Sequence, residues 1–352
     1  MAQLTIITRN TMDFNYVSYT EAFEQHAFPL NRLMLSLGIF DVAPTSEFKV
    51  NFDYLVSGDQ DLAEQVAINA REFGGTIKPK ASNMQYELIG YALEDAVTTQ
   101  DWKGLRKPGS KDAAMTAVDV VGDLLFEQRK KYDRTMNKQL ADCIVRGLQF
   151  NKHGSQQNIV MADEFGSAAV TKNIDLNNAA TLVDIELDSI QTTIRKNLGS
   201  KVDYLKGFVA LCSPEYFRAV KSNQSVRDTF KYSQGQSAYN IENLIDYKNE
   251  YPSIQTFFYN NVTFIMVDDA DIGIAANKAV FLPLLFKGSG VFKWHCGPVS
   301  KHQELAAQSS GAPVHHYQIK DSKFGDLFAI TEWCALAINA LPSVIVHSEN
   351  AA

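Results

Sequence analysis

A long apolar repeat with helical spacing is the feature of this chain that most restricts its fold. It follows Pro108-Gly109-Ser110 and continues to about residue 148, and no proline occurs again before Pro214. Steps of three and four residues place these side chains on one face of an α-helix. Ser110 is suited to cap it, so the sequence predicts a helix over about 110–148, roughly 50 Å long. Gly122 is our candidate position for a bend or hinge in this helix.

Two stretches before the long helix have the alternating pattern of β-strands. Apolar and polar residues alternate from Phe48 to Val56, and a second extended stretch lies within 76–91. The residues between them are charged and glycine-rich, which makes this loop hard to bury. We therefore predict that these two stretches form a long hairpin with an exposed, charged tip.

The first 46 residues show no sustained period. They contain scattered aromatic residues, among them Phe14 and Tyr16, and are interrupted by Pro29 and Pro44. Such a segment has little reason to pack on itself. We predict an arm over 1–46 that lies on its own body or on a neighbour; an ordinary lead into the core is the alternative.

After residue 151 the sequence changes toward strand-like patterns. A second amphipathic helix is predicted over about 179–198, with Gly199 as its stop. Ser213-Pro214-Glu215 supplies a cap and a proline at the first helical position, so a short helix is expected there. Short apolar strands follow, and the whole predicts a mixed α+β fold. The predicted strands are 208–212, 262–268, 279–286, 291–294, 327–331 and 344–347.

Length and composition indicate a globular protein. The chain has 352 residues, of which 45% are hydrophobic and 21% charged, which suits two packed lobes and excludes a low-complexity chain. Its longest apolar runs are far shorter than the roughly 20 residues of a membrane span. The first ten residues do not resemble a secretion signal. We therefore expect neither a membrane span nor a secreted protein.

Charge and cysteine content narrow the possible partners. The formal net charge of -7 argues against broad, sequence-independent binding of nucleic acid. A basic cluster on the predicted long helix could touch DNA, but interleaved acidic residues favour an exposed face with ion pairs. The cysteines lie far apart among apolar neighbours, which favours buried, reduced thiols in a reducing cytoplasm. The basic cluster is Arg129, Lys130, Lys131, Arg134 and Lys138, and the cysteines are Cys143, Cys212, Cys296 and Cys334.

Three small groupings suggest catalysis or metal binding, and each is weak. His295-Cys296 with His302 could supply a thiol and a base, but adjacent residues of one strand point to opposite faces. The aspartates of 268–271 lack the spacing of an EF-hand. His315-His316 has no cysteine or carboxylate at zinc spacing. We therefore predict no catalytic, cofactor or metal site.

Several later motifs resemble the phage capsid protein E family. Val209 to Phe217, an apolar strand followed by Ser-Pro-Glu, is similar to that family's strand-then-helix signature. Ala279 to Pro283 resembles its phenylalanine-X-proline strand, and Gly290 to Pro298 resembles its apolar run before a Gly-Pro turn. Val314 to His347 resembles the closing strands. The motifs follow the family's order from about Asn31 to His347.

The resemblance implies a major capsid protein of a tailed bacteriophage, of the lambda type and with the HK97-like fold. That fold has an N-terminal arm, an extended loop, a peripheral domain built on a long spine helix, and an axial domain. The implied ranges are 1–46 for the arm, 47–92 for the extended loop, 93–203 with 313–352 for the peripheral domain, and 204–312 for the axial domain.

The implied function is structural and not enzymatic. The chain would self-assemble as hexamers and pentamers into an icosahedral head shell around double-stranded phage DNA, held without sequence-specific contacts. Portal, scaffolding and decoration proteins would be further partners, and no cofactor, metal or membrane is implied. The protein would be assembled in the host cytoplasm and reside in the virion. An encapsulin-like compartment shell and a cytosolic Cys/His hydrolase are the alternatives.

The arm and the hairpin are the expected subunit contacts, because both carry apolar or ionic groups with no obvious partner in their own lobe. Gly122 would serve as the hinge when the long helix and the strand-rich lobe move relative to each other during shell maturation. The candidate contact residues are Phe14, Tyr16, Asp59, Asp61, Glu64, Arg71, Lys78 and Lys80.

Overall fold

The computed structural model describes most of the chain. The described residues are 32–56, 80–107, 113–153, 158–232, 255–302, 305–306, 311–321 and 323–350, with the backbone alone at 52–56, 80–83 and 230–232. Most candidate contact residues therefore lie outside the described parts, in 1–31 and 57–79. Lys80 is described only by its backbone, as the first residue of a strand.

One sheet is built around the long strand β14 (Leu327–Asn339). β14 pairs antiparallel with β4 (Ile89–Val97) along one edge, and with β13 (His315–Lys320) and β12 (Phe292–Cys296) along the other. β1 (Asp41–Pro44) adds a parallel strand beyond β12. β14 is almost entirely apolar and buried, as expected for a strand with neighbours on both edges and a helix on one face.

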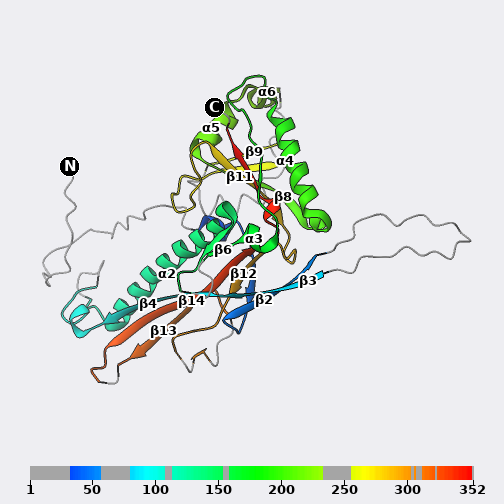
Figure 1. The fold of residues 1–352 in the computed structure, drawn as a ribbon. Helices are drawn as coiled ribbons and strands as arrows, with labels where there is room; N and C mark the ends of the chain where they lie inside the picture. Colours follow the sequence, from blue (N-terminus) through cyan, green and yellow to red (C-terminus); the bar gives the residue numbers. More distant parts are fainter. Residues whose placement is uncertain are drawn as a thin grey trace, which may run out of the picture.

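The long helix α2 (Ala117–Ala141) lies along this sheet (Figure 1) and continues as a π-helical turn, η2 (Asp142–Arg146), to Gly147. The predicted start near Ser110 was wrong. Arg106 and Ala114 form a β-bridge, and Thr116 begins the helix through a capping box with Asp119. Local hydrogen bonding at Thr116, and not the first available cap, therefore fixes the helix start.

The predicted apolar face of the long helix is largely correct. Most of its members from Val121 onward are buried, including Tyr132, Met136 and Leu140. Val118 is the exception, because its side chain is 76% exposed. The first turn of α2 therefore presents an apolar side chain to its surroundings and not to the core.

A second sheet lies above the first in Figure 1. Its order is β7 (Val170–Thr171), β15 (Val346–Glu349), β11 (Lys278–Leu285), β8 (Leu205–Cys212), β10 (Val262–Met266) and β9 (Thr256–Tyr259). The predicted strands of this region are confirmed, with small shifts at their ends. The strands mix parallel and antiparallel pairing, with β8 parallel to β10 and antiparallel to β11.

Three helices accompany the second sheet: α4 (Val183–Leu198), α5 (Pro214–Ser222) and α6 (Gln224–Tyr232). The predicted apolar face of α4 is buried throughout, and the helix ends at Gly199 as expected. Ser213 caps α5 by accepting a hydrogen bond from the Tyr216 backbone N–H at 3.3 Å. Both helices were thus correctly predicted, because their signals are local.

The predicted hairpin is also present. β2 (Lys49–Val56) and β3 (Lys80–Glu87) pair antiparallel from Lys49–Glu87 to Val56–Lys80, and Figure 1 shows them extending away from both sheets. The remaining elements are short: α1 (Leu33–Ser36), β5 (Leu148–Phe150), β6 (Asn158–Val160), α3 (Met161–Phe165) and the 3-10 turns η1 (Thr99–Asp101), η3 (Gly199–Tyr204) and η4 (Pro342–Val344).

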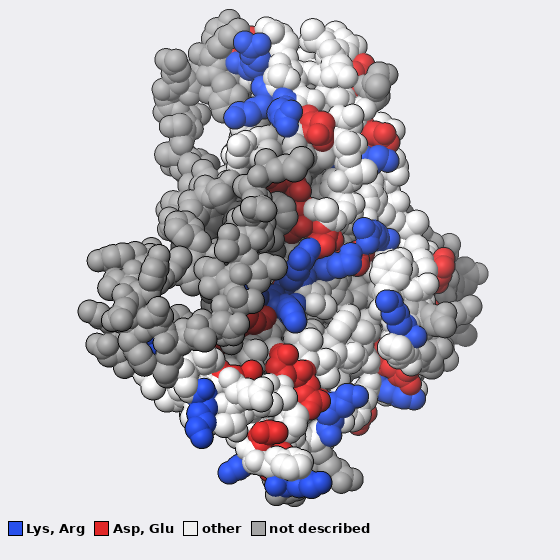
Figure 2. Space-filling view, turned by 90° about the vertical axis from the view of Figure 1, so that its left-hand side faces the viewer, with Lys and Arg blue, Asp and Glu red and all other residues white. Residues whose placement is uncertain are grey.

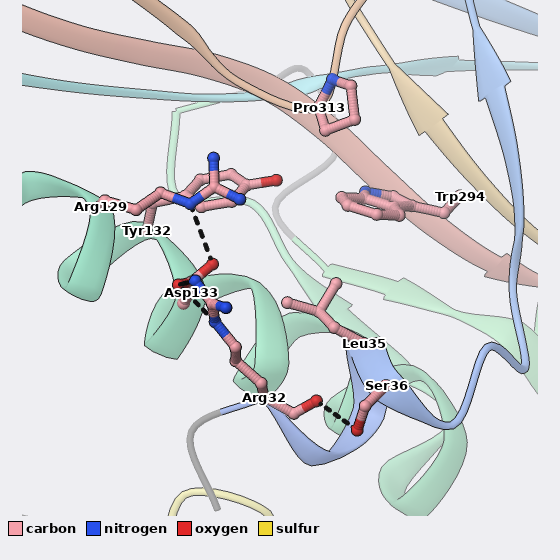
Figure 3. Close-up of a pocket in the computed structure, with 8 residues that line it drawn as sticks. All are labelled: Arg32, Leu35, Ser36, Arg129, Tyr132, Asp133, Trp294 and Pro313. Atoms are coloured by element: carbon pink, nitrogen blue, oxygen red, sulfur yellow. Dashed lines mark hydrogen bonds and ion pairs between the residues drawn. The ribbon is translucent and has the colours of Figure 1, made fainter. Parts of the chain in front are cut away.

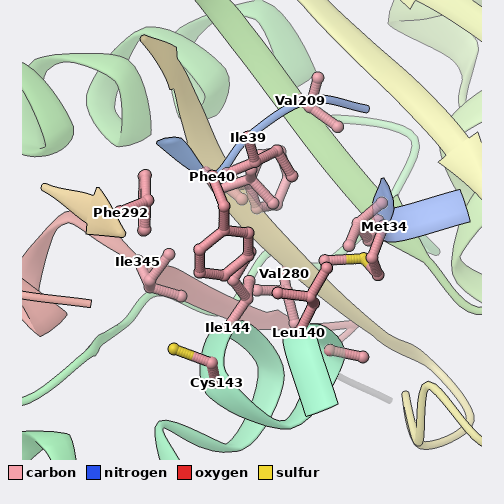
Figure 4. Close-up of a cluster of buried hydrophobic side chains, with 14 of the residues drawn as sticks. Met34, Ile39, Phe40, Leu140, Cys143, Ile144, Val209, Val280, Phe292 and Ile345 are labelled. Atoms are coloured by element: carbon pink, nitrogen blue, oxygen red, sulfur yellow. The ribbon is translucent and has the colours of Figure 1, made fainter. Parts of the chain in front are cut away.

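A continuous core joins the two sheets. Figure 4 shows Ile144 after α2 and Phe292 of β12 packed near Val209 of β8 and Val280 of β11. The chain crosses between the sheets repeatedly, so β12 pairs with β14 while β15 pairs with β11. The borders predicted for the peripheral and axial domains stay a prediction. Within the described parts, no helix has the length and apolarity needed to cross a membrane.

Candidate subunit-contact surfaces

The hairpin β2–β3 is attached to the body at its base. Val50 and Tyr86 are buried there, and the Tyr86 hydroxyl donates to Glu164 Oε2 at 2.9 Å. Burial, together with this hydrogen bond, raises the pKa of Tyr86 above its ordinary value. Lys49 and Glu87 form an ion pair at 3.5 Å across the two strands. The contacts described for the hairpin thus gather at one end.

Away from its base, the hairpin has no described strand beside it. β2 and β3 form a separate two-stranded sheet, paired only with each other among the described strands. A two-stranded hairpin alone in water is marginally stable, and its outer edges offer unpaired backbone groups. The geometry therefore suits a segment that gains further contacts from another molecule.

The described part of the predicted arm, which begins at Arg32, is held against α2. Arg32 Nε donates to Asp133 Oδ2 at 2.7 Å, and the Met34 backbone N–H donates to Asn137 Oδ1 at 2.7 Å. Leu33 and Met34 of α1 are buried. The first described residues therefore start at the surface of the long helix, whereas Phe14 and Tyr16 lie outside the described residues.

Most of the basic cluster on α2 is engaged in ion pairs. Arg129 Nε lies 3.3 Å from Asp133 Oδ1, Lys130 Nζ lies 3.0 Å from Glu127 Oε1, and Arg134 Nε lies 2.5 Å from Asp271 Oδ2. Lys138 Nζ lies 3.8 Å from Asp142 Oδ2. Figure 2 shows blue and red groups close together on this side of the molecule. The geometry is that of a surface with mixed charges.

The histidine and cysteine of β12 are unsuited to nucleophilic chemistry. Burial, and to a lesser extent Lys293, lowers the pKa of His295 to about 4. Burial raises the pKa of the Cys296 thiol to about 12, so the thiolate is disfavoured near neutral pH. His302 accepts a hydrogen bond from the Leu305 backbone N–H at 3.3 Å.

The two suggested metal groupings have other roles. Asp271 pairs with Arg134, and Asp269 Oδ1 accepts a hydrogen bond from the Asp271 backbone N–H at 2.9 Å. His316 Nδ1 lies 2.8 Å from Thr331 Oγ1, within the β13–β14 pair. Among the described residues, no group of three or more His, Cys, Asp or Glu side chains is placed to hold a metal ion.

Gly122 lies in an unbroken part of α2. A Cβ atom added there would meet no heavy atom within 4 Å. Sequence reasoning missed two other features of this region: the π-helical turn that follows α2, and a cavity of about 310 Å³ between α1, α2 and β12. The cavity has no local signal, because residues far apart in the sequence build it. The hinge at Gly122 stays a prediction.

This architecture is that of the subunits of phage-type capsids. A prophage capsid protein from E. coli CFT073 has a TM-score of 0.54 and 12% identity, covering 91% of this chain and 93% of that one. The capsid of a native GTA particle has a TM-score of 0.51 and 12% identity, covering 91% of each chain. The mature capsid of bacteriophage PhiM1 has a TM-score of 0.50 and 10% identity, covering 88% of this chain and 84% of that one. The chain therefore has the HK97-like fold, as expected.

The family model described as phage major capsid protein E matches residues 17–349, so the chain belongs to that family. The major capsid protein of Pseudomonas phage KPP10 is 22% identical over 335 residues, which cover 91% of this chain and 92% of that protein. The resemblance stated from the sequence is confirmed. The chain is a structural capsid subunit that assembles with further copies, and not an enzyme, and its place is the virion capsid.

Proposed function

We propose that the chain self-assembles into the icosahedral head shell that encloses the double-stranded DNA of a tailed phage. The match to the capsid protein E family over residues 17–349 carries this proposal. Hexamers and pentamers of the chain tile the shell, and the subunits assemble in the host cytoplasm. Portal and scaffolding proteins, and in some shells a decoration protein, are the further partners.

The hairpin supports the proposed role by its position. Its described anchor is at the base, around Tyr86 and Glu164, while its strands extend away from the body. A closed lattice multiplies weak contacts, so each contact need only be moderate and misplaced subunits can leave. We propose that the hairpin tip (57–79, with Lys80 beside it) and the part of the arm before Arg32 reach neighbouring subunits, through the candidate residues named from the sequence.

The DNA is held inside without sequence-specific contacts in this proposal. The net charge of -7 and the ion pairs along α2 support it, because both reduce the attraction of phosphates. An encapsulin-like compartment is the second candidate within the same fold. DNA content separates the two, since particles purified from an infected or induced host would hold phage DNA only in the first case.

The test is expression of the full chain, followed by sedimentation and negative-stain electron microscopy. Regular shells are the expected result for the wild type. A variant lacking Gly58 to Gly75 should fold with an unchanged circular dichroism spectrum and melting curve, yet form no closed shells. Normal shells from this variant would contradict the role of the hairpin, and a wild type that stays monomeric under all conditions would contradict the proposed function.

We also propose that the long helix and the strand-rich lobe move relative to each other when the shell matures. Gly122 is the proposed hinge, because it is the glycine within α2 and has open space around it. Precursor and expanded particles of the Gly122→Ala variant, compared by electron microscopy, test this idea. An identical course of α2 in both forms of the wild type would reject it.

A further inference from the structure

A surface cavity beside α2 has a lining rich in hydrogen-bond donors. It has a volume of about 310 Å³ and lies between Arg32, Arg129, Tyr132 and Trp294, with Pro313 at its rim. In Figure 3, Tyr132 and Trp294 lie on opposite sides of this space, and the guanidinium group of Arg129 lies beside Tyr132. Arg129 stacks over the Tyr132 ring, with Cζ 4.9 Å from the ring centroid.

Arg129 has hydrogen-bonding capacity to spare. Its contact with Asp133 runs through Nε alone, at 3.3 Å, and 42% of the side chain is exposed. Within the described parts of the chain, its two terminal amino groups have no hydrogen-bond acceptor. Two parallel N–H groups of a guanidinium match the two oxygens of a carboxylate. Stacking on Tyr132 holds the group in place before any ligand arrives.

Asp133 does not oppose an anion in this cavity. Its side chain is 6% exposed, and its two oxygens face the guanidinium groups of Arg32 and Arg129. Its negative charge is therefore largely neutralised. A carboxylate entering beside Arg129 would meet positive groups first.

Trp294 adds a buried donor without a partner. Its indole Nε1 has almost no accessible surface and, within the described parts, no hydrogen-bond acceptor, although the residue lines the cavity. An indole N–H can only donate, and buried donors are usually satisfied. Figure 3 shows the nitrogen on the edge of the ring that faces Pro313. Trp294 therefore brings an unsatisfied donor close to the cavity, and a small shift of its ring would let an incoming acceptor reach it.

We propose that this cavity binds an aspartate or glutamate side chain of a second copy of this chain. The two terminal amino groups of Arg129 would hold the carboxylate, and Trp294 would donate to it or to the adjoining backbone carbonyl. The proposal rests on the proposed function, because shell assembly brings the second copy to this surface. The chain carries 40 acidic against 33 basic residues, so a neighbouring copy presents an excess of carboxylates.

The first experiment compares Arg129→Gln with Arg134→Gln. Arg134 lies on the same helix, pairs with Asp271, and does not line the cavity. Shell formation by purified full-length subunits is measured by light scattering over a range of concentrations, alongside thermal unfolding of unassembled subunits. Arg129→Gln should raise the concentration for half-assembly about tenfold or more, because a charged hydrogen-bonded pair is lost at an interface. Arg134→Gln should change it little.

The second experiment compares Trp294→Phe with Trp333→Phe. Both indole Nε1 atoms are buried without an acceptor in the described parts, but only Trp294 lines the cavity. Removing an unsatisfied donor should not weaken the unassembled subunit through lost hydrogen bonding. Trp294→Phe should therefore weaken the shell more than the subunit, whereas Trp333→Phe should affect both by the same amount.

Two results would overturn the inference. If Arg129→Gln and Trp294→Phe assemble at wild-type concentrations, no carboxylate of a second copy binds here, while shell formation by the wild type keeps the proposed function intact. If both variants destabilise the unassembled subunit as much as the shell, their effect on assembly follows from the contacts of Arg129 and Trp294 within one chain, and no carboxylate of a second copy is bound here. A wild type that forms no shells removes the proposed function and this inference together.

Discussion

Two regions of the molecule differ in how they are stabilised: the contact between α2 and β14, and the hairpin β2–β3. Behind α2, Trp333 of β14 packs against Tyr132 and Tyr91, with ring centroids 5.0 and 5.1 Å apart. The contacts described between the hairpin and the body lie at one end of the hairpin, around Tyr86. One region is therefore stabilised within a single chain, while the other has room for contacts from outside. Stability and assembly should respond to different mutations.

The largest effect is expected at the buried ring between α2 and β14. Trp333→Ala should lower the free energy of unfolding of the unassembled subunit by about 3–5 kcal/mol, because it removes a fully buried ring and leaves a cavity. Urea denaturation followed by circular dichroism measures this. A loss below about 1 kcal/mol would contradict the tight packing described for this interface.

Gln128 ties α2 to the same sheet through polar contacts. Its Nε2 donates to Asp95 Oδ2 at 2.7 Å and to the Ala329 carbonyl at 3.0 Å, and its Oε1 accepts from Thr331 Oγ1 at 2.5 Å. Gln128→Ala should destabilise the subunit by about 2–3 kcal/mol, because the buried Ala329 carbonyl and Thr331 hydroxyl lose their bonds. Lys131→Ala, at an exposed position of the same helix, is the control in urea denaturation and should change stability by less than about 0.5 kcal/mol.

Burial of His295 in β12 makes the stability of the unassembled subunit depend on pH. Its pKa is about 4 in the folded protein against an ordinary value of 6.5, so the unfolded chain takes up the proton first as pH falls. While both states hold a neutral imidazole, above about pH 6.5, the free energy of unfolding is not reduced by His295. As the pH falls from 6.5 toward 4, the free energy of unfolding decreases by at most about 1.4 kcal/mol per pH unit. Urea denaturation at a series of pH values should show a steeper loss for the wild type than for His295→Gln. Parallel curves would contradict burial of the neutral imidazole.

At the hairpin base, Tyr86→Phe removes the hydrogen bond to Glu164 but keeps the buried ring. The unassembled subunit should lose only about 1 kcal/mol. If neighbouring copies hold the hairpin, shells should suffer more than subunits, which sedimentation after mild denaturant treatment would reveal. Tyr216→Phe, which removes a buried hydroxyl that lies 3.0 Å from Ser348 Oγ in the body, gives a comparison for the same change of residue type.

The smallest effect is a gain in stability at Gly122. Because a Cβ there meets open space, Gly122→Ala should stabilise the unassembled subunit by about 0.5–1 kcal/mol. Thermal unfolding measures this gain. A decrease would show that the helix needs the backbone freedom of glycine even before assembly.

Local patterns were enough to predict much of the fold. α4, α5 and the strands β8, β10 and β11 carry their signals within a few residues and were correctly predicted, whereas β14 extends to Asn339, well beyond the predicted 327–331. The start of α2 was not correctly predicted, since the choice between Ser110 and Thr116 depends on a bridge between Arg106 and Ala114. The capping box at Thr116 and this short bridge before it fix the boundary, and the apolar period of the helix does not reveal either of them.

The candidate contact sites were harder to predict. The hairpin was found from alternation and a charged loop, and its pairing is confirmed. The cavity beside α2 was missed, because Arg32, Arg129 and Trp294 come from distant parts of the sequence. Trp294 lies in the Gly290 to Pro298 motif and Arg129 in the basic cluster, but neither pattern indicates that the two side chains meet.

The position of β14 and β15 near the end of the fold has a consequence for synthesis. β14 joins β4 to β12 and β13, and β15 lies between β7 and β11, so both sheets need residues 327–349 to be complete. A nascent chain that has not yet released these strands lacks the central strand of the first sheet and the strand that joins β7 to β11 in the second. Interrupted translation products should therefore be unable to seed a lattice, which gives particle formation a built-in check on chain integrity.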